Sequence, residues 1–334
     1  MRRTYTFDEV ALVPQYNNIP SRTEPVLETW MTRSLKVGMP LVPANMDTVI
    51  DVPLAEVLIE NGGVPIYHRF TDHPGQREWV QRYEGKTFIS AGMHQSNEIH
   101  ELLDLGALGV CIDVAHGHSS AMLRFLENLK RNFPNKAVIA GNVCTPMAYH
   151  DLVNAGADAV KVGIGPGAAC TTRIVTGFGV PQFSAVRECA EVAAKLRVPL
   201  IADGGIRSSR DIVLALAAGA STVMIGKLFA LTEESAAPKR DLPGGGREAK
   251  YRGQASEDFQ NDFYGGLKSM TVAEGTDFWA PVSGSAQSLI DDFLGGLRSG
   301  MTYGGARTIA ELQRKAEFIE VGPAYMDESR PRAL

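Results

Sequence analysis

The chain has 334 residues, and its 33 lysines and arginines against 38 aspartates and glutamates give a formal net charge of -5 at pH 7. Without a dense cluster of basic residues, this acidic balance argues against nucleic acid as a partner. No apolar run is long enough to span a bilayer, and the N-terminal MRRTYTFDEV lacks the apolar core of a signal peptide, so we expect a cytoplasmic protein without a membrane partner.

Eight short apolar runs alternate with helical patterns along the chain, at residues 39–44, 63–67, 87–91, 108–113, 137–142, 158–162, 198–203 and 222–226. Nearly continuous apolar strands are typical of a parallel sheet covered on both faces. Eight strand-and-helix units predict an α/β fold, a (β/α)8 barrel of the triosephosphate isomerase (TIM) type. The competing architecture is a doubly wound open sheet. The glycine pattern at 163–167 contains a proline, however, and comes too late in the chain for the dinucleotide fingerprint of that fold.

Polar or small residues stand at the carboxyl ends of nearly all these runs. In a barrel of this type those ends form one face, where catalytic and binding residues gather. A single polar residue there is an ordinary helix cap or turn former, but its repetition around the sheet favours a shared site. The residues are Asn45, Asp47, His68, Asp113, Asn142, Cys170, Asp203 and Gly226.

The loop after the sixth run, GIGPGAACTTR at 163–173, displays one cysteine, Cys170. Glycines let the backbone approach a bound group closely, and Pro166 stiffens the turn. A thiol held in this way can act as a nucleophile, with Thr171 and Thr172 as proton-handling partners. The alternative is a structural cysteine that packs as a small apolar side chain. The four cysteines, Cys111, Cys144, Cys170 and Cys189, have neither metal-ligand nor disulfide spacing.

This loop, followed by TGFGVPQ at 176–182, resembles the active-site loop of the IMP dehydrogenase and GMP reductase superfamily. The resemblance extends over nearly the whole chain, through the segments FDEVALVP, ANMDTV, AGNV, ADGGIR, YRG and LGGLRSGMTYGGA. It implies a TIM-barrel oxidoreductase that binds the purine nucleotides GMP or IMP and a nicotinamide cofactor. It also implies a homotetramer, which no pattern of the chain itself indicates.

The resemblance assigns catalysis to Cys170, Thr172 and Glu274. The thiolate of Cys170 would add to carbon 2 of the purine, and the other two side chains would move protons. Two glycine-rich strand ends also suit a phosphate group. The implied nucleotide contacts are Asp203 for the ribose, Gly205, Gly226 and Tyr251 for the phosphate, and Gly253, Gln254 and Ala255 for the base. Lys227 departs from the small residue of relatives, and we expect its charge to supply a further phosphate contact.

Cofactor and cation contacts are implied in the same way. Asp113 and Asn142 match positions near the nicotinamide and the base in relatives. Potassium would be bound by the backbone carbonyls of Gly163, Gly165 and Cys170. The two histidines of AHGHS, His116 and His118, are expected to be loop residues because no third metal ligand is in view.

The choice between the reductase and dehydrogenase reactions depends on an arginine–tyrosine pair that this chain lacks. In a GMP reductase the 2-amino group leaves as ammonia and NADPH supplies a hydride, whereas in an IMP dehydrogenase NAD accepts the hydride and water hydrolyses the adduct. Dehydrogenases activate that water with an arginine–tyrosine pair on a mobile flap. Between Tyr251 and Glu274 this chain has Phe263 at the place of the arginine, beside Tyr264. We therefore predict an NADPH-dependent GMP reductase that forms a covalent Cys170 adduct and releases IMP and ammonia.

The predicted organisation is one TIM-barrel catalytic domain over residues 1–334, with a short flap-like excursion after the eighth strand. We expect no inserted regulatory module, because only residues 71–86 lie after the second strand.

Several positions depart from the reductase pattern. Ala168 replaces the usual phosphate-binding serine, the base-reading segment is RGQAS at 252–256, and Thr271 and Ala273 stand before Glu274. IMP dehydrogenase with NAD therefore stays the alternative. A non-catalytic nucleotide-binding paralogue and a modified guanine nucleotide as substrate also stay open.

Overall fold

The computed structural model describes residues 1–331 of the chain. Eight parallel strands form one sheet in the order β4-β11-β10-β9-β8-β7-β6-β5. The first of these strands along the chain, β4, therefore pairs with the last, β11. The strands are β4 (Leu41–Pro43), β5 (Ile66–Tyr67), β6 (Phe88–Ala91), β7 (Gly109–Asp113), β8 (Ala137–Val143), β9 (Ala159–Val162), β10 (Leu200–Asp203) and β11 (Thr222–Ile225). Each coincides with one of the eight predicted runs. The sheet is a nearly closed TIM barrel, which confirms the predicted fold.

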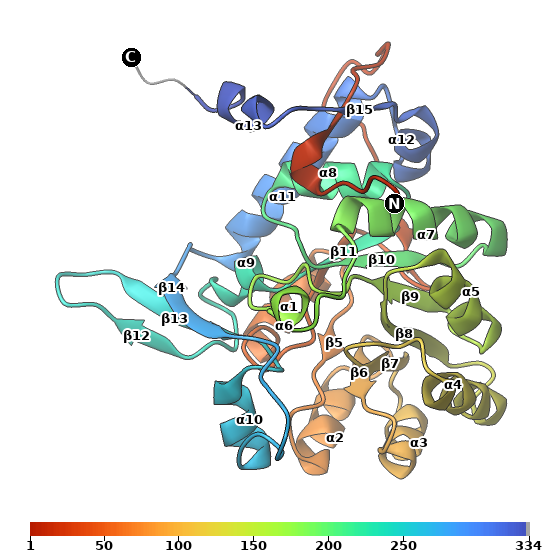
Figure 1. Cartoon of the computed structure of the whole chain (residues 1–334), viewed down its shortest axis with the longest axis vertical. Helices are drawn as coiled ribbons and strands as arrows, with labels where there is room; N and C mark the ends of the chain where they lie inside the picture. The colour runs from red at the N-terminus through yellow and green to blue at the C-terminus, as the bar shows by residue number, and fades with distance from the viewer. Residues whose placement is uncertain (332–334) are drawn as a thin grey trace.

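Helices follow the strands and cover the outside of the barrel (Figure 1). They are α1 (Val52–Glu60), α2 (His73–Arg82), α3 (Ser96–Asp104), α4 (Ser120–Asn132), α5 (Pro146–Asn154), α7 (Gln182–Leu196), α8 (Ser209–Ala217) and α11 (Ala286–Tyr303). Side chains at several N-caps fix where these helices begin. Ser119 accepts a hydrogen bond from the Met122 N–H, and Thr145 accepts one from the Ala148 N–H.

The segment after β11 leaves the barrel and carries its own small sheet (Figure 1). Its elements are α9 (Lys227–Ala230), β12 (Lys239–Asp241), β13 (Arg247–Arg252), α10 (Glu257–Tyr264) and β14 (Asp277–Pro281). The three strands pair antiparallel in the order β12-β13-β14. The predicted excursion after the eighth strand is present and is more structured than the sequence indicated. We call residues 253–276, between β13 and β14, the flap.

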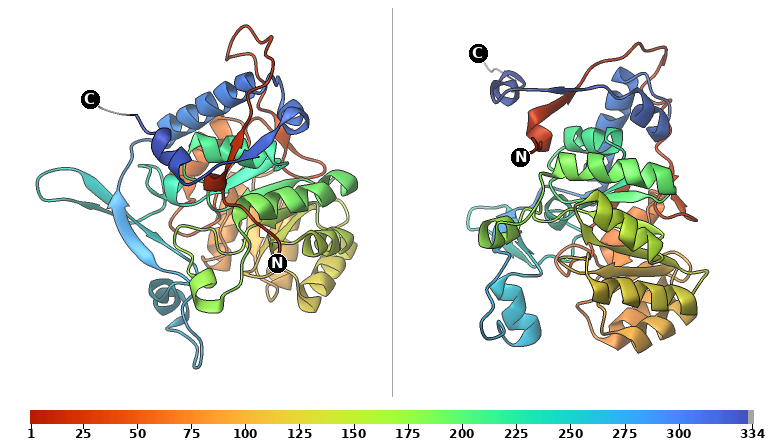
Figure 2. Two further views of the ribbon diagram at one scale, coloured as in Figure 1. Left: turned by 45° about the horizontal axis from the view of Figure 1, so that its top comes forward. Right: turned by 45° about the vertical axis from the view of Figure 1, so that its right-hand side comes forward.

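The two ends of the chain meet outside the barrel. Strand β1 (Val10–Leu12), preceded by η1 (Phe7–Glu9), pairs antiparallel with β15 (Phe318–Glu320). Figure 2 shows this red and dark-blue crossing together with α12 (Ile309–Lys315) and α13 (Ala324–Glu328). A short hairpin, β2 (Thr29–Trp30) and β3 (Lys36–Val37), precedes β4. Among residues 1–331, none of the helices combines the length and apolar character that crossing a membrane requires.

After β5 the chain forms α2 within residues 71–86. The prediction of one catalytic domain includes residues 332–334, which lie outside the described residues, and it stays a prediction.

Candidate active site

The cysteine loop leaves β9 at the carboxyl face of the barrel, packed against the loop after β10. A Cβ atom at Gly163 would overlap the Asp203 carbonyl oxygen, and one at Gly204 would lie 2.8 Å from Pro166 Cγ. Glycine at both positions therefore permits the close approach of the two loops. At the end of the loop, the Cys170 Sγ lies 3.2 Å from the Thr172 Oγ1, to which it donates a hydrogen bond. The predicted nucleophile and its proton-handling partner are thus in direct contact, where α6 (Thr172–Thr176) begins.

The flap brings Glu274 to this cysteine from far along the chain. Cys170 and Gly275 form an antiparallel β-bridge. The Thr171 N–H donates to the Glu274 carbonyl at 2.9 Å, and the Thr276 N–H donates to the Ala169 carbonyl at 2.9 Å. Glu274 is half-buried, and no lysine, arginine or histidine of the described residues pairs with its carboxylate. The backbone of Glu274 is therefore held against the cysteine loop, and its carboxylate has no ion-pair partner among residues 1–331.

Two of the predicted phosphate contacts, Gly226 and Tyr251, lie against each other, and a third, Gly205, packs beside Pro166 of the cysteine loop. A Cβ atom at Gly226 would lie 2.5 Å from the Tyr251 Oη, so this hydroxyl lies against the end of β11. Burial raises the pKa of Tyr251 further above its ordinary value, which keeps the hydroxyl protonated as a donor. Its partner is the weakly accepting Met46 Sδ at 3.5 Å, which a phosphate oxygen would readily replace. Lys227 is exposed, with its Nζ 5.6 Å from the centre of the Phe278 ring.

The predicted base-reading residues lie between the cysteine loop and the first barrel loop. The Gly253 N–H donates to the Thr276 carbonyl, and a Cβ atom at Gly253 would lie 2.9 Å from the Ala169 carbonyl oxygen. Gln254 Nε2 donates to the Asn45 carbonyl at 3.0 Å. The Ala255 carbonyl accepts the Glu274 N–H at 3.0 Å. This first part of the flap therefore contacts both the barrel and the cysteine loop.

The two predicted cofactor residues, Asp113 and Asn142, differ in whether a side-chain oxygen is left without a hydrogen-bond partner. Both oxygens of Asp113 are engaged, Oδ1 by Lys161 and Oδ2 by Asn45. Asn142 uses its Nδ2 on the Gly163 carbonyl and on Asp203 Oδ2, each at 2.8 Å, but its buried Oδ1 has no hydrogen-bond partner among the described residues. A buried acceptor without a partner is costly unless a ligand supplies a donor. The nicotinamide carboxamide carries such a donor, so Asn142 fits the implied cofactor.

Residues 4–332 match the family model described as the IMP dehydrogenase / GMP reductase domain. The chain belongs to the IMP dehydrogenase/GMP reductase family. This is a family of oxidoreductases that use nicotinamide cofactors.

The relatives that this chain resembles include both IMP dehydrogenases and GMP reductases. The inosine-5'-monophosphate dehydrogenase of Aquifex aeolicus is 47% identical over 248 residues, which cover 72% of this chain and 50% of the relative. The chain thus spans half the length of that curated relative. The GMP reductase of Enterococcus faecalis is 40% identical over 331 residues, with 96% and 97% of the two chains covered. A solved GMP reductase variant from Trypanosoma brucei, in complex with guanosine 5'-monophosphate, has a TM-score of 0.93 at 26% identity over 100% of this chain and 98% of its own.

Two carbonyl groups at the start of the cysteine loop of this family member accept hydrogen bonds from side chains. The Gly163 carbonyl accepts the Asn142 amide, and the Ile164 carbonyl accepts Arg173 Nε at 3.2 Å. Neither bond excludes a cation, since a carbonyl oxygen has two lone pairs, so potassium binding by Gly163, Gly165 and Cys170 stays a prediction. His118, near His116, pairs with Asp151 at 2.9 Å.

Lys161 is the residue that sequence reasoning missed. It lies on β9, 2% exposed, with Nζ 2.8 Å from Asp113 Oδ1 and 3.2 Å from Asp203 Oδ2. Burial alone would lower the pKa of Lys161, but attraction to the two carboxylates outweighs burial and raises it. Burial alone would raise the pKa of Asp113, and Lys161 reverses that effect, so the pKa is lowered. The available signal was a lysine inside the otherwise apolar run AVKV.

Arg252 is a second missed residue, and it ties the excursion to the barrel. Its guanidinium reaches Asp47 Oδ2 at 2.6 Å, Asp258 Oδ2 at 2.9 Å and Asp262 Oδ2 at 2.5 Å. Asp47 follows β4, whereas the other two aspartates lie on α10. One side chain therefore clamps the helix of the flap to the first barrel loop.

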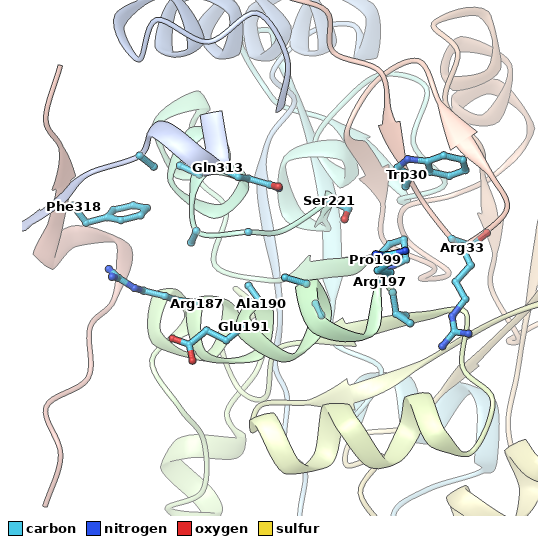
Figure 3. A pocket seen from close by; sticks show the side chains of 18 residues that line it. Trp30, Arg33, Arg187, Ala190, Glu191, Arg197, Pro199, Ser221, Gln313 and Phe318 are labelled. Carbon is cyan, nitrogen blue, oxygen red and sulfur yellow. The ribbon is translucent and has the colours of Figure 1, made fainter. Parts of the chain in front are cut away.

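A cavity of about 650 Å³ lies elsewhere, between α7, α12 and the β2–β3 hairpin (Figure 3). Pro199 and Ser221, which line it, precede β10 and β11, so it opens at the amino ends of these strands. None of the predicted site residues lines it. Barrel enzymes carry their chemistry at the opposite face, so we place the active site by its side chains rather than by this cavity.

Proposed function

We propose that this protein is a GMP reductase, which uses NADPH to convert GMP to IMP and ammonia. The observation that carries the proposal is the composition of the flap. The backbone of Glu274 lies against the cysteine loop. At the position of a water-activating arginine, however, the flap has Phe263, whose ring centre lies 5.4 Å from that of Phe70 and 5.5 Å from that of Phe259. Without a group that activates water, hydrolysis of a covalent adduct is slow and reduction is favoured.

The proposed reaction starts with the Cys170 thiolate, which forms a bond to carbon 2 of the guanine. The bond from carbon 2 to the 2-amino group then breaks, and ammonia leaves after protonation through Thr172 and Glu274. NADPH supplies, when bound, the hydride that reduces carbon 2. The sulfur–carbon bond then breaks and releases the thiolate and IMP. GMP, NADPH and two protons thus give IMP, NADP and ammonium. The covalent route divides one difficult substitution into two easier steps.

The remaining residues are proposed to hold the substrates. Asp203 accepts from the ribose hydroxyls, and the phosphate is held by the backbone at Gly205 and Gly226, by the Tyr251 hydroxyl and by Lys227. The segment Gly253, Gln254 and Ala255 faces the base. Asn142 binds the nicotinamide, next to Asp113. A homotetramer and a cytoplasmic location stay predictions, and sedimentation analysis of the purified protein tests the first.

IMP dehydrogenase is the second candidate, because the higher identity, 47%, is to the Aquifex aeolicus dehydrogenase. A paired absorbance assay separates the two. One arm holds GMP with NADPH, and the other holds IMP with NAD and potassium. Loss of reduced nicotinamide with ammonia release in the first arm is the result expected of a reductase. A gain in the second arm alone, with XMP formed, contradicts the proposal. If the absorbance of reduced nicotinamide changes in neither arm although the protein binds GMP, the result indicates a changed substrate or a non-catalytic protein.

Cys170→Ala links the assay to the mechanism. We expect turnover to fall by at least about 10³-fold, because the nucleophile is lost, while GMP binding stays measurable by calorimetry. Cys189→Ala, which removes a buried thiol on α7, is the matched control and should keep the rate. Substantial residual turnover in Cys170→Ala would remove covalent catalysis from the proposal.

A further inference from the structure

Lys161 occupies a position between the two halves of the proposed site without facing either substrate. Its Nζ has three oxygen acceptors, Asp113 Oδ1 at 2.8 Å, Asp203 Oδ2 at 3.2 Å and Asn45 Oδ1 at 3.5 Å, beside the weaker acceptor Met224 Sδ at 3.8 Å. An ammonium group has three N–H donors, so this set uses all of them. No donor is left for a ligand, and Lys161 therefore acts through its neighbours.

The carboxylate of Asp203 is fixed on one side only. Its Oδ2 accepts from Lys161 and from Asn142 Nδ2, whereas its Oδ1 has no hydrogen-bond partner among residues 1–331. The side chain is partly exposed, at 20%. The carboxylate thus directs one bound oxygen toward the barrel and leaves the other as an acceptor for a group that enters from outside.

On the other side of Lys161, the Asp113 carboxylate is fixed at both oxygens, Oδ1 by Lys161 and Oδ2 by Asn45. Asn45 Nδ2 donates to Asp113 Oδ2 at 3.2 Å and to Ser90 Oγ at 2.9 Å. These residues come from β6, β7, β9, β10 and the ends of β4 and β8, so one hydrogen-bonded network crosses the carboxyl face of the barrel. Lys161 is the only lysine or arginine of the described residues that forms an ion pair with either carboxylate.

We propose that Lys161 is a positioning residue for ribose recognition, because it holds Asp203 so that the free carboxylate oxygen accepts the ribose hydroxyls. The inference rests on the proposed function, in which Asp203 binds the ribose. It goes further in assigning part of the specificity for the sugar to an ammonium group that never touches it. Without Lys161, the Asp203 carboxylate can rotate away from its partner on β8, and two carboxylates face each other without a cation.

The test measures the dissociation constants of GMP and of its 2',3'-dideoxy analogue. Their ratio is the readout, because a variant that only destabilises the protein does not change it. Two hydroxyls that donate to a charged acceptor should give the wild-type protein a preference for GMP of about 100-fold. We expect Lys161→Met to reduce this preference to about tenfold or less, measured by calorimetry without NADPH. Lys130→Met is the matched control, since it removes another partly buried ion pair, with Asp158 at 2.7 Å, away from the site. It should lower the melting temperature and keep the ratio.

Asp113→Asn should also keep the ratio, because Lys161 and Asp203 stay paired. If Lys161→Met does not fold, the double variant Lys161→Met/Asp113→Asn restores the charge balance and should show the same loss of preference. A folded Lys161→Met or double variant that discriminates as well as the wild-type protein overturns this inference alone. A wild-type protein that binds both nucleotides equally overturns the ribose role of Asp203 in the proposed function, and this inference with it.

Discussion

The barrel face and the flap both carry charged side chains beside the cysteine loop, but they hold them in different ways. On the barrel face, charges sit at the ends of strands that are paired on both sides, and Lys161 is 2% exposed. The flap is held by the Arg252 clamp, by the bond from Gln254 to the Asn45 carbonyl, by backbone bonds to residues 169–171 and by the packing of Phe70 on α10. Its tip is solvated, with Val272 66% exposed.

This difference suggests a division of labour. The barrel face carries the residues proposed to bind the nucleotide and the counterions that fix them, whose geometry must not change. The flap carries Glu274, whose proposed role in proton transfer would require approach and withdrawal during a catalytic cycle. Substitutions in the two regions should therefore change different quantities.

The largest effect is expected from Glu274→Gln, which removes a proton-transfer group and leaves the barrel unchanged. The turnover number should fall by about 10² to 10³-fold, since general acid–base catalysis contributes this much. Calorimetry should give an unaltered dissociation constant for GMP. Glu257→Gln, on the exposed side of the same flap, is the control and should keep the rate. Equal single-turnover rates for Glu274→Gln and wild type would contradict the assignment.

The next effect is a pH dependence that connects the two regions. Burial lowers the pKa of His68 to about 4, from an ordinary value of 6.5, and its Nδ1 accepts the N–H of Phe70 at 3.1 Å. Between these two values the unfolded chain binds more protons than the folded one, so the free energy of unfolding falls as the pH drops from 6.5 to 4. The expected loss is about 3 kcal/mol, from 1.4 kcal/mol per pKa unit.

His68→Asn keeps an acceptor at a similar position but cannot be protonated. Urea unfolding of this variant should therefore show a smaller loss of stability over the same pH range than wild type. Parallel curves for the two proteins would show that His68 does not titrate as described.

A smaller effect is expected from Arg252→Met, which breaks the clamp. Removal of charge-assisted hydrogen bonds at this partly exposed side chain should cost about 2 kcal/mol locally. Amide hydrogen exchange in residues 253–276 should become about 30-fold faster at that cost, whereas exchange in β10 should not change. Arg247→Met, at the exposed hairpin beside Glu233, is the control. Uniform acceleration across barrel and flap would remove the distinction between the two regions.

The barrel face was largely predictable, and the flap was not. Buried parallel strands give apolar runs that can be counted, and their ends place Asp113, Asn142 and Asp203 on one face before any coordinates are known. Lys161 was missed because one charge within an apolar run does not change the strand pattern. Its meaning depends on carboxylates from two other strands, and only the fold brings these together.

The small sheet and the clamp were invisible for a different reason. Strand β13 reads REAKYR and alternates regularly, but only Ala249 and Tyr251 are buried, so the strand has too few apolar residues to stand out in a polar segment. Two partners of Arg252 lie on the following helix, α10, and the third, Asp47, lies on a loop more than 200 residues earlier in the chain. Resemblance identified Glu274, but the contact of its backbone with the cysteine loop required the structure.

The most direct test of the central claim is to trap the covalent purine on the enzyme. The wild-type protein is mixed with GMP labelled at carbon 8 and with NADPH, quenched in acid within one turnover, digested and analysed by mass spectrometry. We predict label on the peptide that contains Cys170, with none in Cys170→Ala. Conversion of GMP to IMP at the full rate with no label on Cys170 at any quench time would contradict the account.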